Sequence, residues 1–507
     1  MGRLISIRRL CGLLLVVSVT TVLGGESDSS QVESEQWGIM LMQGKRVGFA
    51  NTIVSRRGDP QKPQWISETH QQMKIKRLGT ELLVTEHSRI VENDQGLVLN
   101  FEKKTQSAGM NSVVRGYRVG NELVMLSRGM EQRCPFSPEA IGPRAFGKKM
   151  RVEMPLQAGS KWKSQTFMTN APQAPAIVSV QVNHKEPREV QGKKLDLWNS
   201  TSEISILPGL KVTVWMDANH QAIVSKMSFP GIGDIEQIMT TREEAMKELE
   251  SAELFAPTLI TPSKPLKNVS KLSKATFRLS TNGSQPLTFW SGGEQVVSQT
   301  TPGFTEVTVT IPHHDEAAAT WSLPSKGGGD LDLYLKETPY LEIKNQIIQD
   351  LALQAVGNEK IPLRAARKIE AFVRSYIRKK DLSVAFASAG ETARSRQGDC
   401  TEHAVLAAAL GRAVGLPTRI VTGIGYLPTN YSGQETANNG LFGFHMWAEA
   451  WLGENQWVAM DAALNGFDVG HIAIAKTALQ ETSPMIDLTV PLLHAMEKLK
   501  IDVLSAE

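Results

Sequence analysis

The chain has 507 residues, of which 41% are hydrophobic and 21% are charged. This composition is ordinary for a globular protein and excludes an intrinsically disordered one, and a chain of this length holds roughly two to four domains. Its 55 basic and 52 acidic residues nearly cancel, leaving a net charge of +3. The charge balance therefore predicts no nucleic-acid partner and no polybasic attachment to anionic lipid.

Residues 1–25 have the pattern of a cleaved secretory signal peptide. Arginines precede an apolar run at 10–23, and small residues follow it at Gly24 and Gly25. The run is shorter than the roughly 20 residues of a membrane-spanning helix. We therefore expect an exported protein, periplasmic or extracellular, without stable membrane insertion after cleavage. The alternative is a protein anchored in the membrane by the uncleaved segment.

Three cysteines are present: Cys11, Cys134 and Cys400. Cys11 leaves with the signal peptide, and the two that remain are too few for a secreted fold built on disulfides. Either Cys134 and Cys400 pair with each other, which would make Cys400 structural, or each is a free thiol with its own role.

Residues 36–250 form the first predicted domain, which is rich in β-structure. Segments of alternating hydrophobicity recur there and are separated by turn-forming residues, such as the NDQG run at 93–96. They predict an antiparallel sheet that is strongly curved or closed on itself. No group of residues with catalytic chemistry stands out in this domain.

A proline-rich linker leads to a predicted small β-sandwich-like segment at 255–325. Residues 313–316 read His-His-Asp-Glu, but consecutive residues point in different directions and rarely bind one ion together, so no metal site is expected there. From 330 to 507 the pattern becomes helical and then mixed, and a catalytic domain is predicted. The fold class expected for the chain is α+β.

A helix is predicted from about Cys400 to Val414. Asp399 is a favourable N-cap, Glu402 completes a capping box three residues later, and Gly415 suits the left-handed position that ends a helix. Cys400 is therefore expected at the first helical position. There the helix dipole, together with a nearby imidazolium, can lower a cysteine pKa from about 8.5 to roughly 3.5–7.5.

Two histidines compete as the partner of this thiol. His403 lies on the same helix and cannot easily approach a substrate from the opposite side. His445 begins a predicted strand, HMWAEAWL, and a tight turn leads into the returning strand QWVAMDAAL. If Leu452 pairs with Gln456 across the turn, Asp461 becomes the diagonal neighbour of His445. A carboxylate there can hold the imidazole in one tautomer, so His445 is the preferred partner.

The segments GDCTEHA, GLPTRIVTGIGY and FHMWAEAWLGENQWVAMDAAL together resemble the core of the transglutaminase-like superfamily. The resemblance begins at about residue 343 or 362 and ends at residue 464. It implies a papain-like α+β fold and a Cys-His-Asp triad. Carried over by position, Cys400 is the nucleophile, His445 is the general base and acid, and Asp461 is the carboxylate that orients the imidazole.

Two donors are candidates for stabilising an oxyanion beside the thiol. One is the backbone N–H of Cys400, because amides in the first turn of a helix have no intrahelical partner. The other is the side chain of Gln397. The alternative is that Gln397 is an ordinary loop glutamine, and the sequence supports this interpretation equally well. The animal transglutaminases that the core resembles depend on calcium, but no acidic loop with calcium-ligand spacing is found here. No metal and no cofactor are therefore expected.

The predicted reaction is thiol-dependent acyl transfer or hydrolysis on amide bonds, peptide or isopeptide, through a thioester on Cys400. The expected partner is a protein or peptide substrate, with the cell envelope as a candidate location. Because the β-rich region precedes the core, unlike the order in those enzymes, hydrolysis is at least as plausible as crosslinking. The alternative is a non-catalytic exported binding or scaffold protein that uses its β-rich N-terminal domain.

Overall fold

The computed structural model describes residues 32–480 and 499–507, apart from gaps at 60, 78, 108–109, 138, 208–209, 230–232, 255–257, 282–288, 302, 315–319, 381–386, 429–438, 455 and 465. The predicted signal peptide and Cys11 lie outside the described residues. The chain divides into two compact units, an N-terminal unit that ends at Leu254 and a C-terminal unit, Phe255–Glu507.

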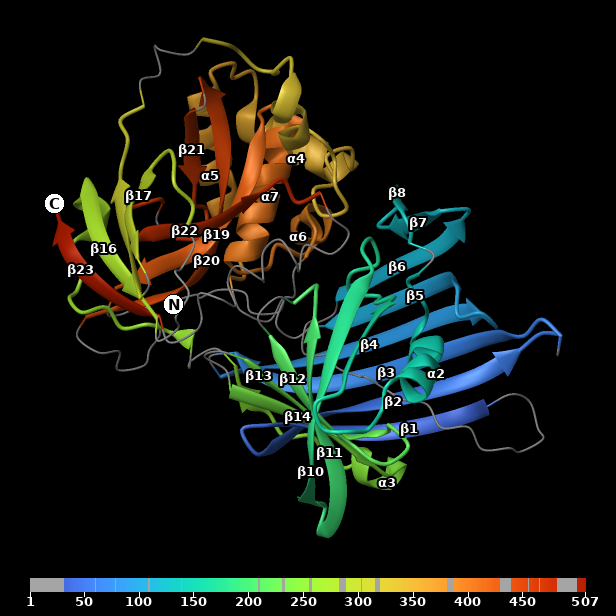
Figure 1. The fold of residues 1–507 in the computed structure, drawn as a ribbon. Coiled ribbons are helices and arrows are strands. Elements are labelled where there is room, and N and C mark those ends of the chain that lie inside the picture. The colour runs from blue at the N-terminus through green and yellow to red at the C-terminus, as the bar shows by residue number, and fades with distance from the viewer. Residues whose placement is uncertain are drawn as a thin grey trace. The chain divides into compact units, whose positions relative to one another are not determined.

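The described part of the N-terminal unit is a large sheet with two short helices (Figure 1). Its strands are β1 (Val32–Met42), β2 (Lys45–Arg57), β3 (Gln64–Arg77), β4 (Thr80–Asn93), β5 (Val98–Ser107), β6 (Met110–Val119), β7 (Glu122–Ser127), β8 (Met130–Pro135), β9 (Lys161–Thr166), β10 (Ala176–Val190), β11 (Lys193–Ile204), β12 (Lys211–Met216), β13 (Ala222–Phe229), β14 (Gly233–Thr240) and β15 (Ala252–Glu253). Its helices are α2 (Pro143–Glu153) and α3 (Arg242–Ala245).

The strand order is β8-β7-β6-β5-β4-β3-β2-β1-β14-β13-β12-β11-β10-β9. Strands that pair along this path are consecutive in sequence except β1 and β14, whereas the consecutive strands β8 and β9 lie at its two ends. Along this path every pair is antiparallel, and only the two-residue β15 adds in parallel, to β3. The β10 strand alternates as predicted: Val178, Val180 and Val182 are buried, whereas Gln181 is exposed. The prediction of a β-rich N-terminal region is confirmed.

The C-terminal unit combines two four-stranded sheets with a group of helices. Its strands are β16 (Lys274–Ser280), β17 (Gln295–Thr301), β18 (Phe304–Thr310), β19 (Thr418–Leu427), β20 (Leu441–Gly453), β21 (Gln456–Met460), β22 (His471–Thr477) and β23 (Lys500–Ala506). Its helices are η2 (Val269–Lys271), η4 (Gly329–Tyr334), α4 (Gln346–Val356), α5 (Pro362–Tyr376), α6 (Ala389–Ser395) and α7 (Cys400–Ala413).

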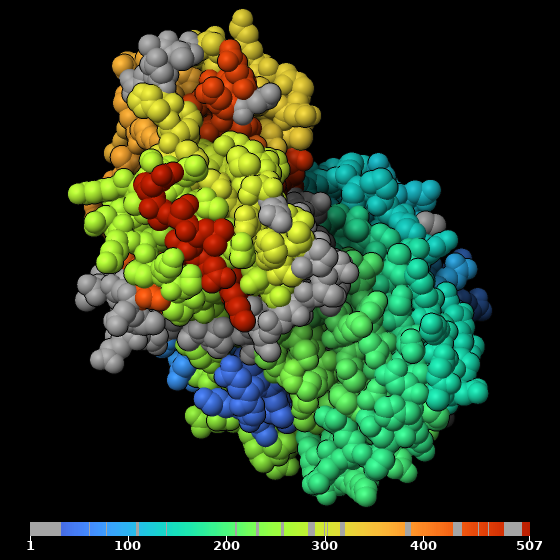
Figure 2. All heavy atoms as spheres, turned by 60° about the vertical axis from the view of Figure 1, so that its left-hand side comes forward, coloured from blue at the N-terminus to red at the C-terminus, as the bar shows by residue number. Residues whose placement is uncertain are grey.

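One of the two sheets, called the smaller sheet because its four strands contain fewer residues in all, takes one strand from the end of the chain. Its order is β17-β18-β16-β23, and Figure 2 shows the dark red β23 lying along the yellow-green residues of this sheet. Gln295 of β17 connects the sheet to the larger one: its side-chain oxygen accepts the Ala473 N–H at 2.7 Å and its amide donates to the Ala473 carbonyl at 2.9 Å. Residues 274–310 therefore belong to the same compact unit as the helices.

The larger sheet has the antiparallel order β21-β20-β19-β22, and α7 packs against β19 and β20. Every residue of α7 from Cys400 to Arg412 is buried, because α4, α5 and α6 surround the helix on its other sides. This combination of a central helix and an antiparallel sheet confirms the α+β fold class. Helices long and apolar enough to span a bilayer are absent from the described part of the chain.

Candidate active site

Cys400 is the first residue of α7, as the sequence predicts. The Asp399 side chain accepts a hydrogen bond from the Thr401 N–H at 2.9 Å, and the Glu402 side chain accepts one from the Asp399 N–H at 3.0 Å. The predicted capping box is therefore confirmed. The helix ends at Ala413, one residue before the predicted end.

The segment that leads into Cys400 has little conformational freedom. A Cβ added at Gly398 would lie 2.3 Å from the Cβ of Glu402, far inside contact distance, so a side chain there would displace the capping glutamate. The same glutamate accepts the Ala387 N–H at 3.0 Å, which ties the start of α7 to the chain ahead of α6. Cys400 is 4% exposed and is thus held on a rigid helix start.

The ring of His403 is committed to its own helix. Its Nδ1 lies 2.6 Å from the carbonyl oxygen of Asp399, and the residue is 1% exposed. Burial lowers the pKa of His403 to about 4, so the ring is neutral at neutral pH. A neutral ring cannot supply an imidazolium beside Cys400, which leaves His445 as the candidate.

His445 lies within β20 and not at its start. The strand begins four residues earlier, at Leu441, which pairs with Leu427 of β19; the prediction of a strand start at His445 was therefore wrong. The reason is that β19 is long enough to pair with residues 441–444 as well. Beside the imidazole lies Gly425, where an added Cβ would come within 3.1 Å of the Cβ and Cγ of His445. The glycine leaves the space that the ring needs.

Asp461 is hydrogen-bonded to His445 inside the unit. The distance from Asp461 Oδ2 to His445 Nε2 is 2.8 Å, and both side chains are almost completely buried. Asp461 directly follows β21, whose last residue, Met460, pairs with Ala448. This register makes Asp461 the diagonal neighbour of His445, as the sequence predicts.

The turn of the hairpin differs in one detail. The sequence predicts Leu452 opposite Gln456, but Gly453 takes that place. An irregularity between Trp451 and Gly453 absorbs one residue, and Gly453 has a φ of 117°, a conformation that a glycine adopts easily. The shift is confined to the turn, so the register near His445 is unchanged.

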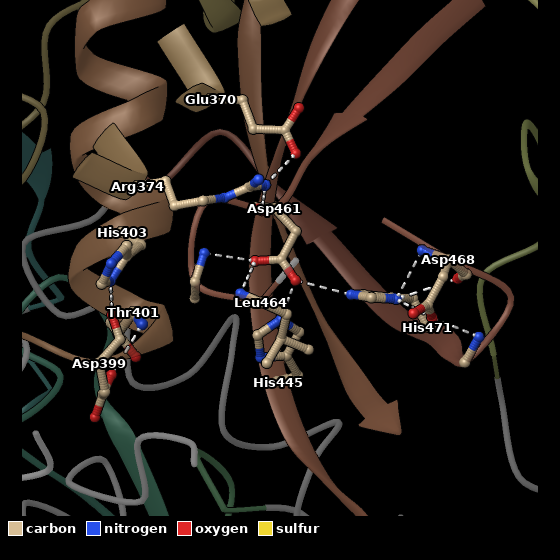
Figure 3. Close-up of polar contacts among 12 residues, drawn as sticks. Glu370, Arg374, Asp399, Thr401, His403, His445, Asp461, Leu464, Asp468 and His471 are labelled. Carbon is tan, nitrogen blue, oxygen red and sulfur yellow. Dashed lines mark hydrogen bonds and ion pairs between the residues drawn. The ribbon is translucent and has the colours of Figure 1, made fainter. Parts of the chain in front are cut away.

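The other carboxylate oxygen of Asp461 is bound to the backbone of the following turn. Oδ1 accepts the N–H of Ala463 at 2.9 Å and the N–H of Leu464 at 3.2 Å. Figure 3 shows His445 and His471 approaching the carboxylate from different directions. Both oxygens therefore have directed partners, which fixes the plane of the carboxylate.

His471 is a second histidine at this carboxylate, and the sequence reasoning missed it. It opens β22, and its Nε2 lies 2.9 Å from Asp461 Oδ2 (Figure 3). Its Nδ1 lies 3.0 Å from Oδ1 of Asp468. No local signal marks this residue: it is an isolated histidine at the start of a strand. Only the pairing of β22 with β19 in the larger sheet brings it to Asp461.

The charges of Asp461 and His471 depend strongly on each other. Burial alone would lower the pKa of His471, but the hydrogen bonds to Asp461 and Asp468 outweigh it and raise the pKa to about 10. Burial alone would raise the pKa of Asp461, but His445 and His471 outweigh it and hold that pKa well below its usual range. Asp461 is therefore a carboxylate, and His471 is an imidazolium, at neutral pH.

Helix α5 holds the turn that carries Asp461. The Arg374 guanidinium donates to the Asp461 carbonyl at 3.0 Å, and Arg367 donates to the Ala459 carbonyl at 3.0 Å. Glu370 lies between the two arginines and accepts from both (Figure 3 shows the Arg374 contact). In the sequence, Glu370 is three residues from Arg367 and four from Arg374, a spacing that predicts ion pairs along one helix face. An ordinary solvent-exposed helix has the same spacing, so the sequence does not indicate the contact with Asp461.

Gln397, the candidate oxyanion donor, lies in the segment before α7. It forms an isolated bridge with Lys379, and its Oε1 lies 3.4 Å from the Lys379 ammonium. This contact involves the carbonyl end of the side-chain amide. The oxyanion role of Gln397 stays a prediction.

His445, Asp461 and His471 each contribute one potential ligand atom, and these three atoms lie within 4.8 Å of one another. They are joined directly by hydrogen bonds of 2.8 and 2.9 Å, so the arrangement is a hydrogen-bonded network of imidazoles around one carboxylate. The expectation of no metal stays a prediction. In the 313–316 segment, Asp315 and Glu316 lie outside the described residues.

Cys134 and Cys400 form no disulfide in the described structure. The alternative of a Cys134–Cys400 disulfide is therefore wrong, and Cys400 has no structural crosslink. Cys134 packs beside a hydrophobic cluster of the N-terminal unit. A buried thiol at a helix start, together with an imidazole oriented by a carboxylate, is the arrangement that supports nucleophilic catalysis.

The N-cap of α7 can be tested separately from the chemistry. Asp399→Ala removes the acceptor of the Thr401 N–H and is expected to lower the free energy of unfolding by about 1 kcal/mol, whereas Asp399→Asn keeps an acceptor and most of that free energy. Thermal unfolding of the full chain measures both variants. Equal unfolding temperatures for the two variants would contradict a capping role.

Comparison with known proteins identifies the region that contains these residues. Residues 349–462 match the family model of the transglutaminase-like superfamily. No curated protein sequence matches the chain.

Three solved structures overlap the chain loosely. A candidate cysteine protease from Cytophaga hutchinsonii has 18% identity and a TM-score of 0.32, over 41% of this chain and 82% of that one. A β-barrel-like protein of unknown function from Brucella abortus has 10% identity and a TM-score of 0.31, over 42% and 96%. A candidate protease from Parabacteroides distasonis has 11% identity and a TM-score of 0.17, over 72% and 68%. Such low TM-scores assign neither substrate nor reaction.

Proposed function

We propose that the chain cleaves or transfers amide bonds through a thioester on Cys400. The match of residues 349–462 to the transglutaminase-like superfamily supports a thiol-dependent enzyme. The observation that carries the proposal is the 2.8 Å hydrogen bond between His445 and Asp461, formed in the unit whose central helix begins at the cysteine.

The first half of the reaction forms the acyl-enzyme. The Cys400 thiolate attacks the carbonyl carbon of the amide, and the S–C bond forms as the carbonyl electrons move onto oxygen. The C–N bond then breaks, and His445 transfers its proton to the leaving amine. The Nε2 atom of His445 is bound to Asp461, so we assign this proton transfer to Nδ1. The backbone N–H of Cys400 and the side chain of Gln397 are the proposed donors to the oxyanion.

The second half of the reaction regenerates the thiol. His445 removes a proton from water or from a primary amine, and this nucleophile attacks the thioester carbonyl. The C–S bond breaks and returns the electron pair to Cys400. Water yields a carboxylic acid and an amine yields a new amide, so the same residues serve both reactions. The proposed substrate is a protein or peptide, and an exported location remains part of the proposal.

Alkylation tests the proposed nucleophile without a known substrate. Because a thiolate paired with an imidazolium reacts at a pH where an ordinary thiol is protonated, Cys400 is expected to react with iodoacetamide at pH 6 at least 10-fold faster than a model thiol. His445→Ala should remove this advantage. The labelled peptide is quantified by mass spectrometry, which separates Cys400 from Cys134, the internal control.

The opposite result would have a clear meaning. If Cys400 reacts no faster than the model thiol, and His445→Ala leaves its rate unchanged, the enzyme proposal fails. The alternative of a non-catalytic binding or scaffold protein would then be favoured. If labelling is fast, a peptide library incubated with and without an added primary amine distinguishes hydrolysis from transfer, because transfer adds the mass of the amine to a product.

A further inference from the structure

His471 links two carboxylates in the interior of the C-terminal unit. Its Nε2 lies 2.9 Å from Asp461 and its Nδ1 lies 3.0 Å from Asp468, and the histidine side chain has no exposed surface. In Figure 3 the ring lies between the two carboxylates, while His445 approaches Asp461 from another direction. Asp461 therefore has two imidazole partners, although a triad requires only one.

Aromatic side chains enclose this histidine. Trp447 meets the ring edge-on with centroids 5.3 Å apart, and Phe467 lies 4.8 Å away. His471 is held at the start of β22 by the turn before it, in which the Asp468 carboxylate also accepts the Gly470 N–H at 2.9 Å. Burial among these rings prevents water from replacing either hydrogen bond, so the position of His471 is well defined.

Two protonation arrangements fit the contacts at Nδ1. In a neutral ring Nδ1 accepts the Asp468 N–H, which lies 3.2 Å away. In an imidazolium Nδ1 donates to the Asp468 carboxylate at 3.0 Å. Nε2 donates to Asp461 in both. A neutral ring would leave the buried Asp461 carboxylate without the positive charge of His471, and an uncompensated buried charge is costly. The imidazolium is therefore the favoured form.

From this geometry we infer that His471 is a positioning residue, which holds the Asp461 carboxylate against His445 Nε2 and shares its negative charge. The inference rests on the function proposed above. Its physical basis is that Asp461 accepts from His445 and His471 at Oδ2 and from two backbone amides at Oδ1, so rotation of the carboxylate would break several hydrogen bonds together.

The two imidazole rings are 5.3 Å apart between centroids, so a positive charge on His471 lies close to His445. Other charged or titratable groups around the pair are Glu370 and Arg374 on α5, His403 on α7, and Asp461 and Asp468.

Two substitutions separate the hydrogen bond from the charge. His471→Gln can place an amide N–H near the position of Nε2, which keeps a donor to Asp461 but removes the charge; His471→Leu removes both. The probe is iodoacetate, an anion that reacts best with Cys400 while His445 is protonated. The decrease of the alkylation rate at high pH therefore reports the loss of the His445 proton. Circular dichroism and thermal unfolding establish that each variant is folded.

The expected results differ between the variants. At the optimum pH, His471→Gln should alkylate within about threefold of the wild type, whereas His471→Leu should be at least about 10-fold slower because Asp461 loses a fixed orientation. In His471→Gln the alkaline limb should differ from that of the wild type, since a charge near His445 is gone. A folded His471→Leu with the wild-type rate and pH profile would overturn the inference.

Nuclear magnetic resonance tests His471 without any activity. In ¹⁵N-histidine-labelled protein at pH 8, the ring that disappears in His471→Gln should have both nitrogens protonated. A neutral ring at that pH would overturn the inference even if Cys400 is reactive. Conversely, if Cys400 is unreactive but His471 is doubly protonated, the proposed function is contradicted. The contacts of His471 with the two carboxylates would still be established. The two failures are therefore distinguishable.

Stability should follow pH in the matching direction. The pKa of His471 is raised from 6.5 to about 10, so its stabilising contribution is complete below pH 6.5 and is lost as the pH rises through about 10. The wild type should therefore exceed His471→Gln in unfolding temperature most clearly at pH 6, with the difference shrinking toward pH 10. A difference that does not change between pH 6 and 10 would contradict a charged His471.

Discussion

Cys400→Ser is expected to lower the turnover rate at least about 10⁴-fold in an assay with an identified substrate. A serine hydroxyl is not ionised near neutral pH, and the helix start and imidazole that suit a thiolate do not make it an equivalent nucleophile. The substitution removes little volume, and α7 keeps its capping box, so the fold should be retained. Mass spectrometry of the quenched reaction should detect an acyl-enzyme in the wild type and none in the variant.

The matched control is Cys134→Ser, which changes the other free cysteine of the described chain. Cys134 lies on β8 of the N-terminal unit, away in sequence from the residues that surround Cys400. Its replacement should leave turnover unchanged. Equal losses in the two variants would indicate a general effect of thiol loss on folding, and a Cys400→Ser protein that still turns over would exclude Cys400 as the nucleophile.

Asp461→Asn is expected to reduce the turnover rate by about 10³–10⁴-fold, and the variant should still fold. The backbone amides of Ala463 and Leu464 donate to Oδ1, so an asparagine will keep its carbonyl there and turn its N–H₂ toward the histidines. His445 must then accept at Nε2 and carry its proton on Nδ1. That tautomer cannot accept the proton in the proposed mechanism, because the exchanging nitrogen is already protonated.

Stability should fall in the same variant. Asp461 pairs with two buried imidazoles, and removing one member of a buried ion pair costs about 3–5 kcal/mol. Asp468→Asn is the matched control, because it weakens one contact of His471 but leaves the 2.8 Å bond between Asp461 and His445 in place. Its effect on Cys400 alkylation should be much smaller. An Asp461→Asn protein with wild-type alkylation and pH profile would show that Asp461 does not orient His445.

Features set by neighbours in sequence were predictable. The start of α7 depends on Asp399 and Glu402, which lie within three residues of each other, and the hairpin register depends on the short turn between β20 and β21. Both are local, so the residue types alone indicate them. The same reasoning could not locate the start of β20, because that depends on how far β19 extends beside it.

Features set by distant parts of the chain were not predictable in this way. The side chain of Gln295 binds the backbone of Ala473, and β23 completes a sheet begun near residue 274, over separations of more than a hundred residues. Arg374 reaches the carbonyl of Asp461 from α5. A lone glutamine or arginine in a sequence carries no sign of such a partner, because a long-range contact depends on the packing of whole elements.

The candidate site shows the same division. The amino-acid sequence by itself determined Cys400 at a capped helix start and His445 beside Asp461, because local capping and hairpin geometry specify them. Only the tertiary structure decided that His403 is bound to its own helix and that Asp461 is shared with His471. The reason is that β22 reaches the carboxylate through its pairing with β19, a contact that forms only when the whole sheet is assembled.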